Sequence, residues 1–153
     1  MRLIVAVVGK PRNAALAAAI EEYETRAARY WPLDVHEVRE ERSSGLSPSV
    51  VSRREGERLA DRVGDARIVA CDPHGKSLTS EKFAEWLAKE RDLGRDTAFV
   101  VGGAYGLSDE ILNRSHMKLS LAPWTLPHEL ARLVLAEQLY RAGSILRGEP
   151  YHK

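Results

Sequence analysis

Residues 97–107 read TAFVVGGAYGL, and this stretch decides the fold class. Its first five residues form an unbroken apolar run, as expected for a strand that is buried on both faces of a sheet. Glycines follow at once, and they permit a tight turn in which backbone amides approach a ligand closely. Ser108 can then cap a short helix. This order of strand, glycine turn and helix predicts a unit of an α/β domain.

The same alternation of strand and helix extends over the whole chain. Strands are expected at residues 2–8, 33–38, 66–71, 97–101 and 118–121, and helices at 13–30, 49–63, 79–91, 108–113 and 127–147. The third strand is expected to end at Asp72-Pro73-His74-Gly75, and the polar residues 40–49 are expected to form a mobile loop. The pattern predicts a mostly parallel sheet with helices on both faces, in a single domain of residues 1–153.

Composition narrows the class of protein further. With 44% hydrophobic and 29% charged residues among 153, the chain is typical of a soluble globular domain. No apolar run approaches the roughly 20 residues that cross a bilayer, and no secretory signal is recognisable, so we expect a cytoplasmic protein without membrane contact. The net charge of +1 does not by itself indicate nucleic acid, although the segment from Arg114 to Lys153 is mildly basic.

Three loops with unusual chemistry follow predicted strands. They span Cys71 to Lys76, Gly102 to Leu107 and Ala122 to His128. Ligands of parallel sheets bind beyond the carboxyl ends of the strands, where these loops would meet. The dinucleotide fingerprint and the P-loop are both absent, so a nucleotide-like ligand would be held in another way. Each loop alone also fits a purely structural turn or connector.

The third of these loops is stiffened by two prolines. Pro123 and Pro127 flank Trp124, and they fix the directions of the remaining backbone amides and carbonyls. Such a loop suits recognition of an adenine edge by main-chain atoms. A rigid connector with a packed tryptophan is the alternative interpretation.

The end of the chain carries two further features. The helix at 127–147 is apolar nearly all round, which indicates either a subunit interface, and hence a homodimer, or a central core helix. Beyond it, Tyr151, His152 and Lys153 bring an aromatic ring, an imidazole and a cation together, which can contact RNA, although a disordered tail is the plainer interpretation. No metal site is expected, because Cys71 and His74 lack further ligands at usable spacing.

Taken together, these segments resemble one known family, the ribosomal RNA large subunit methyltransferase H family of SPOUT methyltransferases. The resemblance covers the whole chain. It is most specific in Phe99-Val-Val-Gly-Gly-x-x-Gly-Leu-Ser108, Thr125-Leu-Pro-His128, Tyr140-Arg-Ala142 and Arg147-Gly-Glu-Pro-Tyr-His-Lys153.

The resemblance implies a SPOUT fold with a C-terminal trefoil knot and a homodimer whose active site is completed by the partner. It also implies S-adenosyl-L-methionine (SAM) as methyl donor, no metal, and methylation of N3 of a pseudouridine in 23S ribosomal RNA on the assembled 70S ribosome. Cofactor contacts are expected at Cys71, Gly103, Ala122, Pro123, Trp124, Thr125, Leu126 and Pro127. This chain has Cys71 where the family often has leucine, and Ala104-Tyr105 where some members have Pro-Glu.

Roles in the reaction are expected near the chain end. We expect His152, Arg141 and Tyr151 to be catalytic, and His128 and Lys153 to bind substrate. His152 is expected to assist loss of the N3 proton, with His128 or solvent as the alternatives. Four arginines of the charged helix at 49–63 can touch RNA phosphates or simply face solvent: Arg53, Arg54, Arg58 and Arg62. The alternative function is a non-catalytic ribosome- or RNA-binding factor with a degenerate SAM pocket.

Overall fold

The computed structural model describes all residues from Met1 to Lys153, and strands and helices alternate along them as expected. The strands are β1 (Leu3–Val8), β2 (Leu33–Val38), β3 (Arg67–Ser77), β4 (Thr97–Val101) and β5 (Met117–Ser120). The helices are α1 (Ala14–Ala27), α2 (Pro48–Val63), α3 (Ser80–Asp92), α4 (Asp109–Arg114) and α5 (His128–Leu146).

The strands form one sheet in the order β2-β1-β4-β3-β5, and every neighbouring pair is parallel. The central strand β4 pairs with β1 and β3, so that Phe99 lies between Val5 and Val69. All five residues of β4 are buried. The predicted α/β class and the buried glycine-flanked strand are therefore confirmed.

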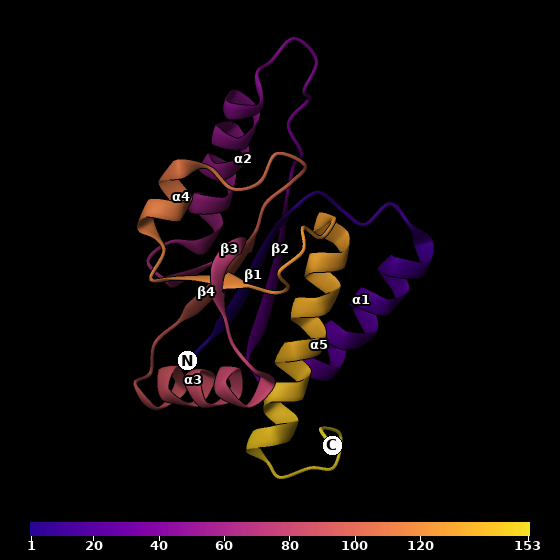
Figure 1. Ribbon diagram of the computed structural model, residues 1–153, viewed down its shortest axis with the longest axis vertical. Helices are drawn as coiled ribbons and strands as arrows, with labels where there is room; N and C mark the ends of the chain where they lie inside the picture. The colour runs from indigo at the N-terminus through magenta and orange to yellow at the C-terminus, as the bar shows by residue number, and fades with distance from the viewer.

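Helices cover both faces of the sheet, as Figure 1 shows. On one face, Leu3, Val5 and Val7 of β1 join the core beneath α1, α3 and α5. On the other face, the alternate residues Ile4 and Ala6 pack with residues of α2 and α4. β1 thus contributes to two cores, which explains why its sequence is apolar throughout rather than alternating.

The third strand is longer than the sequence indicates. β3 continues past Asp72-Pro73-His74-Gly75 to Ser77, and its pairing with β5 resumes at Lys76 after a register shift. A bulge here accommodates Pro73, which has no amide for the ladder. A Cβ on Gly75 would lie 2.5 Å from the backbone of Lys118, so only glycine fits at this point. The prediction that the strand ends at Cys71 was therefore wrong.

The structure also shows what surrounds the charged helix α2 and the apolar helix α5. Charged α2 buries Val51, Leu59 and Val63 against the sheet, although its sequence suggests little apolar surface. The apolar α5 packs against both α1 and α3 within the same chain, so much of its apolar surface already has a partner. The core interpretation thus accounts for the buried part of α5.

The chain end is ordered rather than frayed. After α5, Gly148 turns the backbone with a φ of 67°, and Figure 1 shows the last residues returning alongside the helix. The hydroxyl of Tyr30 donates a hydrogen bond to Glu149, which fixes this turn to the end of α1. None of the helices is both long and apolar enough to pass through a bilayer. The trefoil knot stays a prediction.

Candidate cofactor pocket

A cavity of about 560 Å³ lies beyond the carboxyl ends of β4 and β5 and beside the bulge of β3. Its volume is typical of a site for a ligand the size of a nucleoside. The three predicted loops meet around it, and its walls consist of Cys71, Asp72, Pro73, Val101, Gly102, Gly103, Ala104, Gly106, Leu107, Leu121, Ala122, Trp124, Thr125, Leu126, Pro127, His128 and Ala131. The expected convergence of these loops is therefore observed.

One wall is the glycine turn after β4. Gly106 donates its amide to the carbonyl of Gly103 over 3.1 Å, and its φ of 76° favours glycine. A Cβ on Gly102 would lie 2.6 Å from the carbonyl carbon of Gly106, closer than real contacts allow. The turn therefore requires glycine for its own packing, and it presents backbone rather than side chains to the cavity.

The opposite wall is the proline-flanked loop between β5 and α5. Ser120 fixes its start by donating a hydrogen bond to the carbonyl of Ala122 over 2.6 Å. Leu126 is half-buried against the core, whereas Trp124 is 78% exposed and projects from the rim. Pro123 is exposed and does not line the cavity, so of the six predicted loop residues it is the one outside the wall.

The third wall is the bulge of β3. Burial raises the pKa of the Cys71 thiol to about 12, so the side chain packs as an apolar group and is not a nucleophile. Asp72 is the one carboxylate in the lining, and no lysine or arginine lines the cavity. No group of three or more histidine, cysteine or acidic side chains is placed to hold a metal ion.

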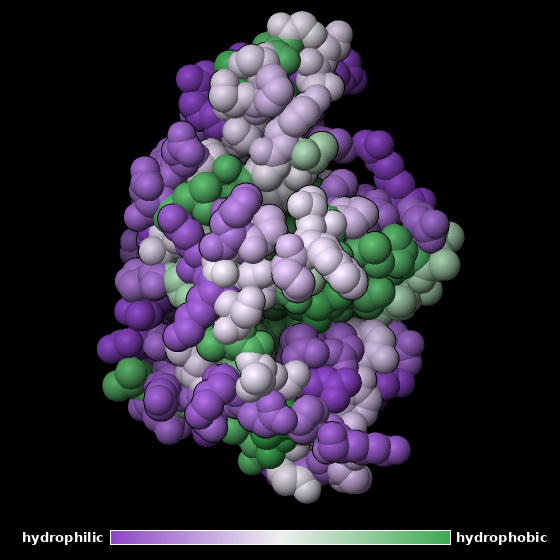
Figure 2. Space-filling model, in the orientation of Figure 1, coloured by the Kyte–Doolittle hydropathy of each residue, from purple (hydrophilic) through white to green (hydrophobic).

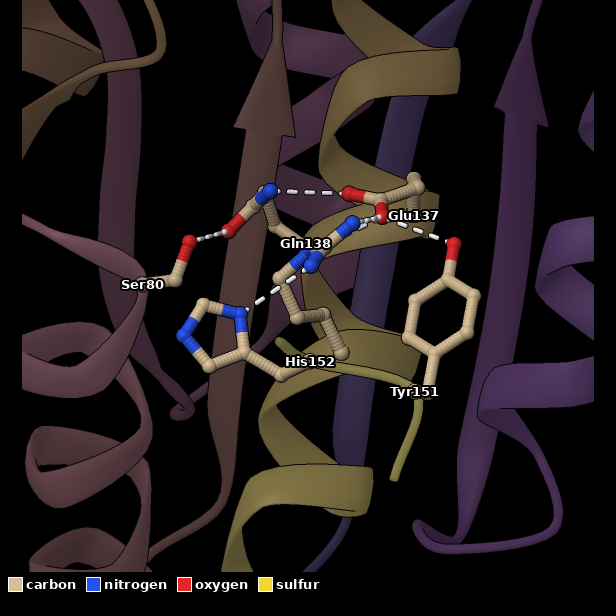
Figure 3. A network of polar contacts seen from close by, with 6 residues as sticks. Ser80, Glu137, Gln138, Tyr151 and His152 are labelled. Carbon is tan, nitrogen blue, oxygen red and sulfur yellow. Dashed lines mark hydrogen bonds and ion pairs between the residues drawn. The ribbon is translucent and has the colours of Figure 1, made fainter. Parts of the chain in front are cut away.

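A second polar cluster lies near the other end of α5, and Figure 3 shows its residues on α5 and in the tail. Glu137 accepts hydrogen bonds from Nε of Arg141 over 2.9 Å and from the hydroxyl of Tyr151 over 3.0 Å. His152 lies 3.0 Å from Nη1 of Arg141 and 2.8 Å from Glu81 of α3. We call Glu81, Glu137, Arg141, Tyr151 and His152 the tail cluster.

These contacts shift several ionisation equilibria. The hydrogen bond from Arg141 to Glu137 raises the pKa of the guanidinium. Burial, with hydrogen bonds including that to Glu137, raises the pKa of Tyr151 above its usual value. The hydrogen bond from His152 lowers the pKa of Glu81. Arg141 is therefore a fixed cation and Tyr151 a fixed hydrogen-bond donor in this cluster.

The structure separates the predicted site residues into two groups. His128 lines the cavity with the cofactor residues, whereas His152, Arg141 and Tyr151 belong to the tail cluster, and Lys153 is exposed beyond it. Along the helix, Glu137 lies about 14 Å from His128, because each residue adds about 1.5 Å. Within one chain, the expected catalytic residues do not line the cavity.

Three residues with a place in these sites were not predicted as site residues. Glu137 centres the tail cluster, and its spacing of four from Arg141 indicated only a helix pair. Gln138 extends the cluster by accepting a hydrogen bond from Ser80 over 2.8 Å. Glu55 is buried behind the glycine turn, and the one available signal was the interior glycine that follows it in α2.

Comparison with known proteins identifies the class that this fold and pocket define. The family model described as "Predicted SPOUT methyltransferase" matches residues 1–152. Among solved structures, a probable methylase family protein from Haemophilus influenzae is similar with a TM-score of 0.56 at 12% identity, over 99% of this chain and 70% of that one. The tRNA (m1G37) methyltransferase from Aquifex aeolicus gives 0.51 at 13% identity, over 90% and 69%. At these identities the likeness shows the fold alone.

Sequence relatives then resolve the family within that class. The protein named "Ribosomal RNA large subunit methyltransferase H" from Gemmatimonas aurantiaca is 58% identical over 100% of both chains. Proteins of the same name from Anaeromyxobacter sp. and Clostridium botulinum are 46% and 40% identical, again over 100% of each chain. This chain therefore belongs to the ribosomal RNA large subunit methyltransferase H family.

Proposed function

We propose that this protein transfers the methyl group of SAM to N3 of a pseudouridine in large-subunit ribosomal RNA on the assembled ribosome. The observation that carries the proposal is the cavity beyond β4 and β5 and beside the bulge of β3, whose lining consists mostly of small residues. The relatives named for methylation of this RNA cover the full chain and support the substrate class. The chemistry of the wall supports the cofactor.

The cavity fits SAM better than it fits a phosphate-bearing cofactor. Phosphate-bearing cofactors are commonly held by cationic side chains, whereas this lining contains no lysine or arginine. A sulfonium is itself a cation, and Asp72 is the one carboxylate in the lining. Leu121, Leu126 and Ala131 provide apolar surface for the remainder of the ligand.

When bound, SAM supplies a methyl group that is already activated by its positive sulfur. Transfer to N3 would leave a neutral thioether as the second product and would require the N3 proton to leave to a base. The protein must therefore hold the two reactants in line and accept or route that proton. The glycine turn and the proline-flanked loop perform the first task by fixing the walls.

For the second task we propose that the tail cluster of a second copy of this chain covers the cavity. In one chain the tail cluster lies about two and a half helical turns from His128. Leu130, Leu133 and Val134 of α5 are only half-buried, and Figure 2 shows apolar surface gathered over the first half of this helix. A homodimer that pairs these surfaces would bury them and place an end of each α5 near the partner.

His152 is the proposed base, and its hydrogen bonds define its starting state. Because a guanidinium can only donate, Nδ1 of His152 accepts from Arg141, and Nε2 carries the proton that faces Glu81. The imidazole is thus neutral but has both nitrogens occupied. It can take the N3 proton only after Nδ1 leaves Arg141, whose charge is then available to the target base or a phosphate.

The decisive test is transfer of labelled methyl from SAM to 70S particles that lack the modification, followed by mapping of the labelled base. Label at N3 of one pseudouridine in the large-subunit RNA supports the proposal. Calorimetry with SAM alone separates the remaining outcomes. A protein that binds the ribosome but gives no heat with SAM would instead be a non-catalytic binding factor.

The shared site has its own test. Mixed dimers are formed from one subunit with Gly102→Ala, which distorts the cavity, and one with His152→Ala, which removes the base. If each site uses the cavity of one subunit and the tail of the other, the mixture regains up to about half of the wild-type site count while both parents stay low. Absence of any recovery in verified mixed dimers contradicts the shared site.

A further inference from the structure

Glu55 is a carboxylate that is buried against the back of the cofactor pocket. It lies in the interior of α2, and its residue is 2% exposed. Its Oε1 atom has no hydrogen-bond partner, although nearly all buried polar atoms do. That oxygen would lie 3.0 Å from a Cβ on Gly103, a residue of the pocket wall. Glu55 therefore lies directly behind the glycine turn.

The approach of α2 to this turn is unusually close. A Cβ on Gly56, the next residue, would lie 2.3 Å from the hydroxyl of Ser108, which caps α4. Glycine in a helix interior is destabilising by roughly 0.5–1 kcal/mol relative to alanine, so its presence here needs a packing reason. With Gly56 against Ser108 and Glu55 against Gly103, α2 supports both ends of the turn.

Glu55 also holds a segment on its other side. Its Oε2 atom accepts the backbone amide of Glu41 over 3.0 Å. Arg58, one turn further along α2, donates to the carbonyl of Arg39 over 2.8 Å and pairs with the Glu41 side chain. Glu55 and Arg58 of α2 therefore fix the start of the loop between β2 and α2. This loop projects from one end of the molecule in Figure 1.

We propose that Glu55 is a positioning residue for the cofactor pocket, which holds the Gly102–Gly106 turn in its SAM-binding position while it anchors the backbone at Glu41. The inference rests on the proposed function, because it assigns SAM to the pocket. Glu55 does not line the cavity and touches no reacting atom. Its effect passes through Gly103 and through the backbone that it fixes.

The charges around Glu55 agree with a positioning role. Burial raises the pKa of its carboxyl, and Glu40 and Glu41 act in the same direction, while the Glu41 amide and Arg58 oppose them. Whether protonated or ionised, the carboxyl keeps an acceptor oxygen for the Glu41 amide. A neutral amide of the same shape can therefore replace it, whereas a methyl group can neither accept that hydrogen bond nor fill the space behind Gly103.

The experiment compares Glu55→Gln and Glu55→Ala, with Glu57→Gln and Glu57→Ala as matched controls. Glu57 is exposed two residues further along the same helix, so its variants change the same charge without touching the turn. SAM affinity by calorimetry should fall about tenfold in Glu55→Ala, because a buried amide loses its acceptor and the turn loses its support. It should stay within about threefold of the wild type in Glu55→Gln and in both Glu57 variants.

Amide hydrogen exchange provides a readout that a general loss of stability would not reproduce. Glu55→Ala should speed exchange at the Gly106 amide, which closes the turn, while the amides of β1 keep their protection. Uniform acceleration through β1, or wild-type SAM affinity in folded Glu55→Ala, overturns the proposal. Equal losses in Glu55→Gln and Glu55→Ala also overturn it, because charge rather than position would then matter. If the wild type itself binds no SAM, the proposed function fails, whereas the exchange at Gly106 still tests the positioning role.

Discussion

Substitution of Gly102 by alanine should damage SAM binding more than it damages the fold. The new methyl would lie 2.6 Å from the carbonyl carbon of Gly106 and 2.9 Å from the amide nitrogen of Leu107. Since an ordinary contact begins at 3.4 Å, the turn must move by about 0.8 Å to relieve the closest approach. All the opposing atoms are backbone, so no rotamer change can absorb the methyl.

The size of the effect follows from the strain. Forcing one extra methyl into a packed site costs about 1–3 kcal/mol. If SAM requires the turn in its original position, that strain is taken from the binding free energy, and the dissociation constant should rise roughly 5- to 150-fold. Methyl transfer at subsaturating SAM should fall by the same factor.

Calorimetry with SAM measures the predicted change, and urea denaturation measures the stability of the same variant. Gly64→Ala is the matched control, because Gly64 has a φ of 54° at the end of α2 and nothing lies within 4 Å of its Cβ position. That variant should lose about 1–2 kcal/mol of stability with unchanged SAM affinity. A Gly102→Ala protein with wild-type SAM affinity would refute the assignment of this turn to the cofactor.

Three further predictions concern other parts of the chain. Arg132 of α5 is buried and forms ion pairs with Glu24 over 2.7 Å and with Glu37 over 2.8 Å. Arg132→Met should therefore lower the free energy of unfolding by about 3 kcal/mol, as measured by urea denaturation. A loss below about 1 kcal/mol would contradict the buried network. Trp124 lines the cavity and is 78% exposed, so binding of SAM should change the tryptophan fluorescence of the wild type but not that of Trp124→Phe. A change that persists in the variant would mean that another tryptophan responds to SAM. Burial raises the pKa of Glu55 above its unfolded value, so the folded state loses stability as pH rises through the raised pKa. Glu55→Gln should therefore be more stable than the wild type at about pH 8 but not at about pH 4. Urea titrations of both proteins at the two pH values check this.

The sequence predicted the architecture well because strand burial leaves a local pattern. Five strand-like segments separated by helices were sufficient to predict the parallel sheet, and Ser108 was correctly expected to cap α4. The extension of β3 was missed because Pro73 and Gly75 are ordinary signals for the end of a strand. Only the pairing partner β5, close in space but distant in sequence, shows that Gly75 admits a neighbouring backbone.

Prediction of the site had a different limit. The glycines and prolines that shape the cavity are visible in sequence because they serve the backbone itself. Glu55 was invisible because its role depends on which helix face meets the turn, and nothing local distinguishes it from exposed Glu57. Likewise, the contacts of Tyr151 and His152 to Glu137 and Arg141 depend on the tail folding back, which no local pattern indicates.

The distance between cavity and tail cluster bears on how the site is assembled. α5 has 19 residues and is therefore about 28 Å long, with the cavity at its first residues and the tail held beside its later turns. A rigid helix cannot bring its own two ends together, and freeing the tail would break the contacts of Tyr151 and His152 at once. A twofold axis that pairs two α5 helices in antiparallel orientation requires neither change. It sets the start of each helix beside the end of the other and produces two equivalent sites, because an isologous interface repeats every contact twice. The half-buried Leu130, Leu133 and Val134 lie on the part of α5 that such pairing would cover.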